Sequence, residues 1–296
     1  MRKPSEYEQH VKIDLHIHST ASDGSLSPLE ILNAARDLNL GAIAITDHDT
    51  IDGSKDALAA GIPSSLKFLT GVEISAAPPP SFSFSGSMHI LGYAVRLDDS
   101  DLIHTLDLLQ SSRKNRNPQI IDRLNDLGIH VSLNEVLNEA GENGQVGRPH
   151  IAQVMIKNGF VKSINEAFDR FLGVGKPAYV DKYRIDSNQV IEIIRGAGGL
   201  PVLAHPVLLQ LEKDTALEKL IRTLKEMGLK GIEVYYPEHT PEQIAYYAKL
   251  ADRHDLLVTG GTDFHGSLKP DIMMGTGRGN LHIPYELYEK LIRANS

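Results

Sequence analysis

Short apolar runs alternate with amphipathic segments along most of this 296-residue chain, and this alternation restricts the possible folds more than any other feature. Each run has the length and composition of a strand buried on both faces. The runs are VKIDLHIH, GAIAITDHD, KFLTGVE, MHILGYAV, GLPVLAHP, GIEVYYP and LLVTGGTDFH. Several intervening segments begin with residues typical of helix starts, as at Ser27-Pro28 and Thr240-Pro241. The pattern predicts βαβ units, a mostly parallel sheet and an α/β fold.

Seven such strands can close into a distorted (β/α)7 barrel, a fold that carries its chemistry in the loops at the carboxyl ends of the strands. From about Asp98 to Asp186 the rhythm changes to short helical segments, with no strand of comparable quality. We therefore expect a barrel domain formed by residues 11–98 and 186–296. Residues 99–185 are expected to form a small inserted helical subdomain, or cap. The Pro-rich loop at residues 77–87 is expected to be a turn into an alternating strand.

The composition limits the chemistry that is available. With no Cys, the chain cannot form disulfides, thiolate zinc sites, iron–sulfur clusters or a Cys nucleophile, so any metal must be bound by His, Asp or Glu. We found neither a secretory signal nor the roughly 18 uninterrupted apolar residues of a membrane span, and expect a cytoplasmic protein without a membrane partner. A net charge of −8 argues against a basic face for duplex nucleic acid, but leaves room for a local phosphate site.

The most informative residues are potential metal ligands at or near the ends of the strand-like runs. His16 and His18 are two apart on one strand, so both imidazoles point to the same face. A lone His is usually a hydrogen-bonded core or surface residue, but nine unpaired titratable groups in one cavity would be unstable without cations. Three sites of three or four ligands each would use them, and Mn²⁺, Fe²⁺ and Zn²⁺ all suit such donors. The nine candidates are His16, His18, Asp23, His48, Glu73, His89, His205, Asp263 and His265.

As a set, these motifs resemble those of the polymerase and histidinol phosphatase (PHP) family. They are His16-x-His18 with Asp23, Thr46-Asp47-His48-Asp49, Gly71-Val72-Glu73, His89, Ala204-His205-Pro206 and Asp263-Phe264-His265. The resemblance runs from about Lys12 to the C-terminus and implies an amidohydrolase-like phosphoesterase on a distorted seven-stranded barrel. The insert, with Gly147-Arg148-Pro149-His150 and GKPAYV at residues 175–180, is similar to one branch of the family. That branch removes the 3′-phosphate from nucleoside 3′,5′-bisphosphates or trims short RNA from its 5′ end.

The resemblance also implies how the ligands divide among two to three divalent ions, with manganese favoured. The expected sets are His16, His18, Glu73 and Asp263; Asp23, His48 and His265; and Glu73, His89 and His205, with Glu73 bridging. We expect a hydroxide that bridges two ions to attack phosphorus, while the third ion and Arg148 neutralise the phosphoryl oxygens. His205 and Asp263 are also candidates for proton transfer. Asp47 or Asp49 is a candidate to orient the neighbouring imidazole, and Asp49 fits loop capping equally well.

Four residues are candidates for substrate binding. Arg148 begins a helical segment of the insert and is the main candidate for gripping a phosphate, the alternative being a solvated arginine. His150 fits substrate contact and helix capping equally well. Lys176 lies in GVGKPA, which lacks the Ser or Thr of a Walker motif, so an ordinary loop residue is the simpler interpretation. Arg278 in GTGRGN is a weaker phosphate candidate.

The function that we expect is that of a metal-dependent phosphoric ester hydrolase acting on a phosphorylated small molecule or a short oligonucleotide. It would be a nucleotide phosphatase or a short-RNA exonuclease. Histidinol-phosphate phosphatase is an alternative, although those enzymes resemble the insert less. A second alternative is a non-catalytic metal-binding scaffold, against which the full ligand set argues. The oligomeric state is left open.

Overall fold

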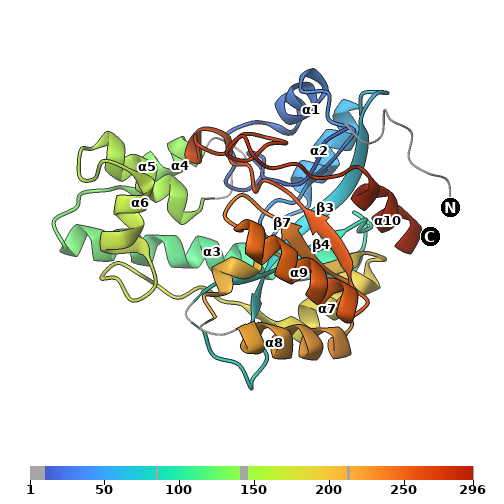
Figure 1. Cartoon of the computed structure of the whole chain (residues 1–296). Helices are drawn as coiled ribbons and strands as arrows, with labels where there is room; N and C mark the ends of the chain where they lie inside the picture. The colour runs from blue at the N-terminus through green and yellow to red at the C-terminus, as the bar shows by residue number, and fades with distance from the viewer. Residues whose placement is uncertain (1–10, 85, 141–145, 212–213, 296) are drawn as a thin grey trace.

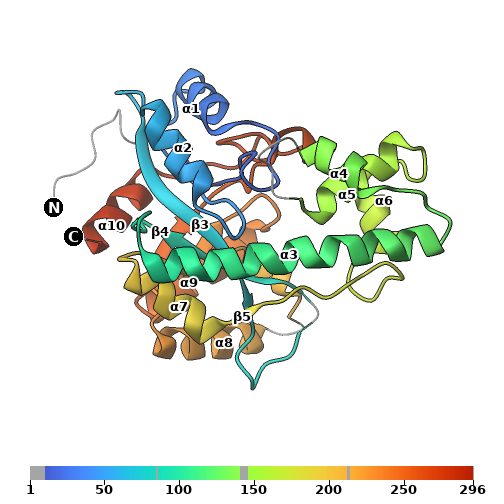
Figure 2. The same cartoon turned by 180° about the vertical axis from the view of Figure 1, so that it is seen from behind.

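The computed structural model describes residues 11–84, 86–140, 146–211 and 214–295 (Figure 1). Residues 1–10, where the sequence predicts no secretory signal, lie outside the described residues, as does Ser85 of the Pro-rich loop. A barrel occupies one side of the molecule and a group of short helices the other. One long helix runs from the first to the second (Figures 1 and 2).

The seven predicted strands are all present, and an eighth short strand joins them. The strands are β1 (Ile13–Ile17), β2 (Ala42–Ile45), β3 (Lys67–Ala77), β4 (Met88–Tyr93), β5 (Ile185–Asp186), β6 (Leu200–Leu203), β7 (Gly231–Tyr235) and β8 (Leu257–Gly260). Seven strands follow the neighbour order β1-β2-β3-β4-β6-β7-β8, and β5 pairs with β3 off this path. The side chains of β1, β2, β4 and β6 are almost entirely buried, as the continuous apolar runs predict.

The sheet curves into a nearly closed, distorted barrel. β4 is antiparallel to both of its neighbours, whereas the other pairs along the path are parallel. An isolated bridge joins Ile17 to Phe264, and the His18 backbone N–H donates to the Phe264 carbonyl at 2.9 Å. The end of β1 therefore meets the segment that follows β8, which confirms the predicted seven-stranded barrel.

Helices cover the outside of the barrel (Figure 1). They are α1 (Pro28–Asp37), α2 (Asp52–Ala60), α7 (Ser187–Gly196), α8 (Asp214–Met227), α9 (Pro241–Arg253) and α10 (Glu286–Ala294), with short 3₁₀ turns η2 (Pro206–Leu209) and η3 (Gly266–Leu268). Ser27 and Thr240 each cap a helix whose first residue is Pro, and each forms a reciprocal capping box. The two predicted helix starts are therefore confirmed.

The inserted segment is helical, as predicted. It contains α3 (Ser100–Asp126), α4 (Leu133–Ala140), α5 (Arg148–Lys157), α6 (Ile164–Ala167) and a π-helical turn, η1 (Phe168–Leu172). The long helix α3 contributes to two hydrophobic cores: Leu102 and Leu106 pack in a barrel core, whereas Ile120 and Leu124 pack in the core of the short helices. α3 therefore carries the cap at a fixed position beside the barrel. The division into residues 99–185 and the remainder stays a prediction. Within the described part of the chain, no helix is both long and apolar enough to cross a membrane.

Candidate metal centre and active site

All nine predicted ligands gather at one end of the barrel. His16 lies in β1 and His18 directly follows it, while Glu73 lies in the middle of the long strand β3. Because β4 runs antiparallel, His89 near its beginning reaches the same end as the carboxyl ends of the parallel strands. The loops after the strands supply the remaining ligands, Asp23, His48, His205, Asp263 and His265. Seven of the nine are buried, and His48 and His89 are half-buried.

Glu73 occupies the centre of this cluster and is 1 % exposed. Its two oxygens contact five imidazole nitrogens: His48 Nδ1 at 2.9 Å, His18 Nε2 at 3.3 Å, His16 Nε2 at 3.5 Å, and both His89 Nδ1 and His205 Nε2 at 2.8 Å. A central carboxylate with both oxygens among imidazoles has the position that the predicted bridging role requires.

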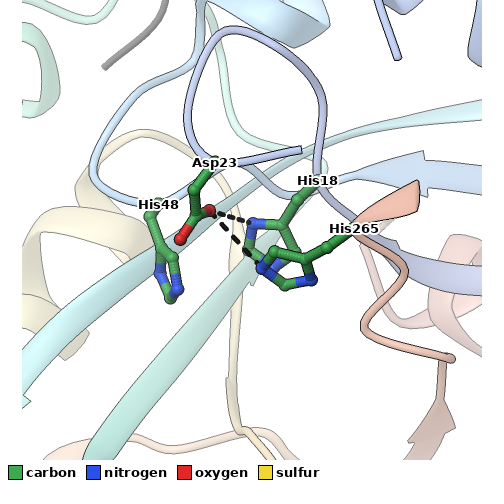
Figure 3. A group of neighbouring side chains, drawn as sticks. All are labelled: His18, Asp23, His48 and His265. Atoms are coloured by element: carbon green, nitrogen blue, oxygen red, sulfur yellow. Dashed lines mark ion pairs between the residues drawn. The ribbon is translucent and has the colours of Figure 1, made fainter. Parts of the chain in front are cut away.

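Two aspartates complete the cluster beside His18. Asp23 Oδ1 lies 3.6 Å from His18 Nδ1 and 3.4 Å from His265 Nε2, with His48 on its other side (Figure 3). Asp263 Oδ1 lies 3.1 Å from His18 Nε2. The second oxygen of Asp263 accepts hydrogen bonds from the Tyr236 hydroxyl and from Lys269 Nζ. Asp263 is therefore held with Oδ1 toward the histidines.

Four groups of ligand atoms are compact enough to surround one ion each, with all donor atoms of a group within 4.8 Å of one another. Two features differ from the predicted sets. His18 also lies close to Asp23, His48 and His265, and His48 also lies close to Glu73 and His89. The groups are His18, Asp23, His48 and His265; His16, His18 and Asp263; His16, Glu73 and His205; and His48, Glu73 and His89. His89 Nδ1 and His205 Nε2 are 3.3 Å apart, so the third predicted set is also brought together. The division of ligands among ions stays a prediction.

The residues of this cluster fit divalent cations. Eleven buried side-chain nitrogen or oxygen atoms among the described residues have no hydrogen-bond partner, and seven of them belong to the predicted ligands. These seven are His16 Nε2, His18 Nε2, Asp23 Oδ1, His48 Nδ1, Glu73 Oε2, His89 Nε2 and His205 Nδ1. Buried polar atoms rarely lack partners in folded proteins, because each one costs about 1–3 kcal/mol. Imidazole and carboxylate donors at one site, unsatisfied by the protein, are what metal coordination requires.

Without metal, protonated imidazoles and ionised carboxylates of the cluster stabilise one another. Burial lowers the pKa of His18, but the neighbouring carboxylates of Asp263 and Glu73 raise it to about 9. Burial likewise raises the pKa of Glu73, but His48, His89 and His16 hold it well below its usual range. Since a metal-bound imidazole must be deprotonated at the coordinating nitrogen, metal binding is expected to release protons.

Two buried carboxylates outside the predicted set support the ligands. Glu233 Oε1 lies 2.9 Å from His16 Nδ1, and its Oε2 accepts a hydrogen bond from the His205 backbone N–H at 2.8 Å. An ionised carboxylate only accepts, so Nδ1 of His16 carries the proton and Nε2 is presented to the cluster. Asp14 accepts hydrogen bonds from the Thr262 backbone and hydroxyl, which fixes the loop before Asp263. Sequence analysis missed both, although Glu233 is a charged residue inside an apolar strand.

Asp47 and Asp49, which flank His48 and were candidates to orient its imidazole, form hydrogen bonds and ion pairs with other residues. Asp47 accepts hydrogen bonds from the Ser19 backbone and hydroxyl and from the Ser22 hydroxyl. Asp49 forms a buried ion pair with Arg113 of α3, whose Nε lies 2.9 Å from Asp49 Oδ2. Burial would raise the pKa of Asp49, but Arg113 and other nearby cations lower it to about 2. Asp49 therefore fastens the cap helix to the metal-bearing end of the barrel.

A cavity of about 310 Å³ opens over the cluster. Five cationic side chains line it: Arg113, Arg116, Arg148, Lys182 and Lys269. Arg113 and Lys269 have carboxylate partners, whereas Arg116 forms no hydrogen bond or ion pair with any described residue. Burial and the nearby Arg113 and Arg148 lower the pKa of Arg116 to about 9. Burial and Arg113 also lower the pKa of Lys182 well below its usual range. The cap side of the cavity therefore has an excess of positive charge, which favours an anion.

Of the four predicted substrate contacts, Arg148 lines this cavity. One of its N–H groups donates to the Leu172 carbonyl at 2.9 Å, and its guanidinium lies over the rings of Phe168 and Tyr179. These contacts fix the plane of the guanidinium and leave other donors for a ligand.

The other three candidates do not line the cavity. His150 is buried, and its Nδ1 accepts a hydrogen bond from the Gly147 backbone N–H at 3.1 Å, so it serves as a helix cap. Lys176 is exposed in its loop. Arg278 is also exposed, with Nη2 3.3 Å from Asp271. The geometry gives none of the three a place at the site.

Sequence analysis missed four of the five cavity cations, namely Arg113, Arg116, Lys182 and Lys269. Arg113 and Arg116 are three residues apart, so they share one helix face. The only signal available was this spacing, which a solvated helix face also produces.

Together, the barrel, the buried nitrogen and oxygen donors and the cationic cavity define a metal-dependent hydrolase of anionic substrates. The chain belongs to the PHP domain family, whose sequence profile matches residues 14–269. It is 32 % identical over 253 residues to a 3′,5′-nucleoside bisphosphate phosphatase of Chromobacterium violaceum, covering 86 % of this chain and 87 % of that protein. It is 34 % identical over 255 residues to a 5′-3′ exoribonuclease of Haemophilus influenzae, covering 86 % and 90 %.

A solved structure gives the same result for the fold. An amidohydrolase from Chromobacterium violaceum, solved with bound sulfate and no metal, has a TM-score of 0.83 at 30 % identity and covers 96 % of this chain and 97 % of its own. The family, the barrel and the phosphoester-hydrolysing relatives confirm the prediction of a metal-dependent phosphoesterase. The non-catalytic scaffold alternative therefore has no support.

Proposed function

We propose that this enzyme removes the 3′-phosphate from nucleoside 3′,5′-bisphosphates. The observation that carries the proposal is a single cavity with the metal-ligand cluster on one side and cationic side chains on the other. A substrate with two phosphates would place one at each side. A cavity of about 310 Å³ suits a mononucleotide far better than a duplex.

We assign two to three divalent ions, with manganese favoured, to the nine ligands. His16, His18, Glu73 and Asp263 would hold one, Asp23, His48 and His265 a second, and Glu73, His89 and His205 a third. When bound, such ions supply Lewis-acid activation of water and of the phosphoryl oxygens. Glu233 keeps His16 in the tautomer that presents Nε2, and Lys269 with Tyr236 keeps Asp263 Oδ1 facing the cluster. Proton transfer by His205 or Asp263 stays part of the proposal.

The second phosphate is assigned to Arg116 and Arg148. Arg116 has no hydrogen-bond or ion-pair partner among the described residues, so its N–H groups are available for a phosphate. Arg148 contributes the donors that its bond to Leu172 leaves over. Arg113 is a weaker candidate, because Asp49 already binds two of its nitrogens. Ile164 and Phe168 line the same cavity and offer an apolar surface for the nucleoside. We also propose that this reaction takes place in the cytoplasm.

A second candidate function is 5′ to 3′ hydrolysis of short RNA, because the chain is 34 % identical to an exoribonuclease over most of its length. The same arginines would then bind a 5′-terminal phosphate. Histidinol phosphate carries one phosphate and would leave Arg116 without a partner, so it is the less suitable substrate.

A substrate panel tests these alternatives on the metal-loaded enzyme. We expect inorganic phosphate to be released fastest from adenosine 3′,5′-bisphosphate, and more slowly from 3′-AMP and 5′-AMP, since each of these leaves one phosphate position empty. Removal of nucleotides from 5′-phosphorylated RNA, without phosphate release from the bisphosphate, would favour the exonuclease. Fastest turnover of histidinol phosphate would contradict both nucleotide functions.

A further inference from the structure

A second cavity, which we call the α3 groove, lies on the outer face of α3. It has a volume of about 460 Å³ and runs between α3 and the segment that leads to β5. Figure 2 shows this segment passing alongside α3 between the cap and the barrel. Leu108, Ser112 and Asn115 line the groove from α3, and Tyr183 lines it from the opposite side. Arg116 lines both the groove and the active-site cavity.

Arg116 is the residue that the linings of the two cavities share. Its side chain is 5 % exposed, and none of residues 11–84, 86–140, 146–211 and 214–295 forms a hydrogen bond with its buried Nε. A phosphate bound there would therefore lie at the boundary of both cavities. A phosphomonoester would use only the active-site cavity, whereas a phosphodiester has a second substituent that the groove can receive.

The lining of the α3 groove suits a nucleoside. Tyr183 is 57 % exposed and Leu108 is 49 % exposed, so both present apolar surface to solvent beside a buried charge. The Ser112 hydroxyl and the Asn115 amide add hydrogen-bonding groups on the same wall. An exposed aromatic ring beside polar groups and a cation is the combination by which proteins bind single-stranded nucleic acids.

We propose that the α3 groove is a subsite for a nucleoside esterified to the phosphate at Arg116, so that the enzyme also removes the terminal 3′-phosphate of short oligoribonucleotides. The inference rests on the proposed 3′-phosphatase function. In this reaction the oxygen of water bonds to phosphorus while the bond from phosphorus to the 3′-oxygen breaks. The 3′-oxygen takes a proton, and the products are inorganic phosphate and an oligonucleotide with a free 3′-hydroxyl. The 5′ end of the substrate lies in the groove, so a free 5′-phosphate is not required.

The test compares adenosine 3′,5′-bisphosphate with the dinucleotide ApAp, whose internal phosphodiester replaces the 5′-phosphate. Both are assayed with the metal-loaded wild-type enzyme, Tyr183→Ala, Tyr183→Phe and the control Leu137→Ala, which removes a similarly exposed side chain from α4 outside the groove. Tyr183→Ala should lower kcat/KM for ApAp by roughly 5- to 100-fold, mainly through KM, because a base loses its stacking surface. Its kcat/KM for the bisphosphate should change by less than about twofold. Tyr183→Phe and Leu137→Ala should behave as wild type on both substrates.

The outcomes separate the two proposals. Hydrolysis of the bisphosphate with no phosphate release from ApAp overturns the groove proposal and leaves the 3′-phosphatase function standing. No phosphate release from either substrate overturns the proposed function itself. Equal loss on both substrates in Tyr183→Ala, or no loss on ApAp, overturns the groove proposal. So does cleavage of the internal diester to adenosine and bisphosphate.

Discussion

Arg116→Met should raise the free energy of unfolding of the protein and lower its kcat/KM. Arg116 is buried in α3, where no carboxylate of the described chain pairs with it, and Arg113 and Arg148 are nearby. A charge in this position destabilises the folded state unless an anion binds. Methionine has similar length, favours helices and needs no hydrogen bonds.

The magnitude follows from the pKa of Arg116. A pKa lowered from 12.5 to about 9 corresponds to at most about 5 kcal/mol of disfavoured charge, and this cost is fully present at pH 7 because that pH lies below both values. Replacement of a buried charge by an apolar residue of similar volume is often neutral or stabilising, by about 1–4 kcal/mol. We therefore expect Arg116→Met to raise the free energy of unfolding by about 1–4 kcal/mol in a buffer without phosphate or sulfate.

The same substitution should weaken substrate binding. Loss of a charge-assisted contact costs about 1.5–3 kcal/mol, or roughly 10- to 150-fold in kcat/KM for adenosine 3′,5′-bisphosphate. Since the contact is to the phosphate that does not react, most of the loss should lie in KM. Inorganic phosphate should also stabilise the wild type more than the variant, because the variant lacks the guanidinium that contributes to phosphate binding.

Urea unfolding at pH 7 and steady-state kinetics measure both effects. The control is Lys114→Met, which makes the same change in net charge at an exposed position of the same helix. This variant should leave stability within about 0.5 kcal/mol and kcat/KM within about twofold. If Arg116→Met, but not Lys114→Met, lowers the free energy of unfolding by more than about 1 kcal/mol, groups within the protein already stabilise the charge of Arg116. Unchanged kcat/KM would show that no phosphate binds there. Either result would refute the reasoning.

Three further predictions concern the metal cluster and the cap. Glu73→Gln should lose more bound metal than Asp23→Asn, because Glu73 contacts five imidazoles, and equal losses by elemental analysis would contradict the bridging role. Glu233→Gln should weaken metal binding about 10- to 100-fold in a competition titration while circular dichroism stays unchanged, since an amide no longer fixes the imidazole tautomer. Arg148→Ala should keep its metal but lose about 10-fold or more in kcat/KM, whereas Lys176→Ala, outside the cavity, should not.

The candidate metal ligands could be selected from the sequence because each lies in a strand or in the loop that follows one. A residue such as His205 directly follows a continuous apolar run, and parallel strands bring their carboxyl ends to one edge of a sheet. His89 reaches this edge for a different reason, since β4 runs antiparallel and His89 lies at its beginning. The sequence did not reveal that reversal. His89 was nevertheless included among the candidates, because its residue type and not the strand direction identified it.

The groups around the ligands could not be predicted, because their roles depend on contacts between distant segments. Glu233 approaches His16 across 217 positions of sequence, and the Asp49–Arg113 ion pair joins a barrel loop to α3. Arg113 and Arg116 have the spacing of an ordinary polar helix face. Only the packing of α3 against the barrel turns that face inward, and packing of this kind leaves no periodic signal in the sequence.

The distribution of charge explains why this cavity should select by charge as well as by shape. The nine ligands include only three carboxylates, so two to three bound divalent ions would make the cluster net positive. Arg116 and Arg148 make the cap side of the cavity positive as well, and burial has already lowered the pKa of each. The two walls therefore repel each other until an anion lies between them. A single phosphate at the metals leaves the cap cations uncompensated, whereas a molecule with phosphates at both ends neutralises both walls at once. Both phosphates of such a substrate would then contribute to binding, although only one of them is hydrolysed.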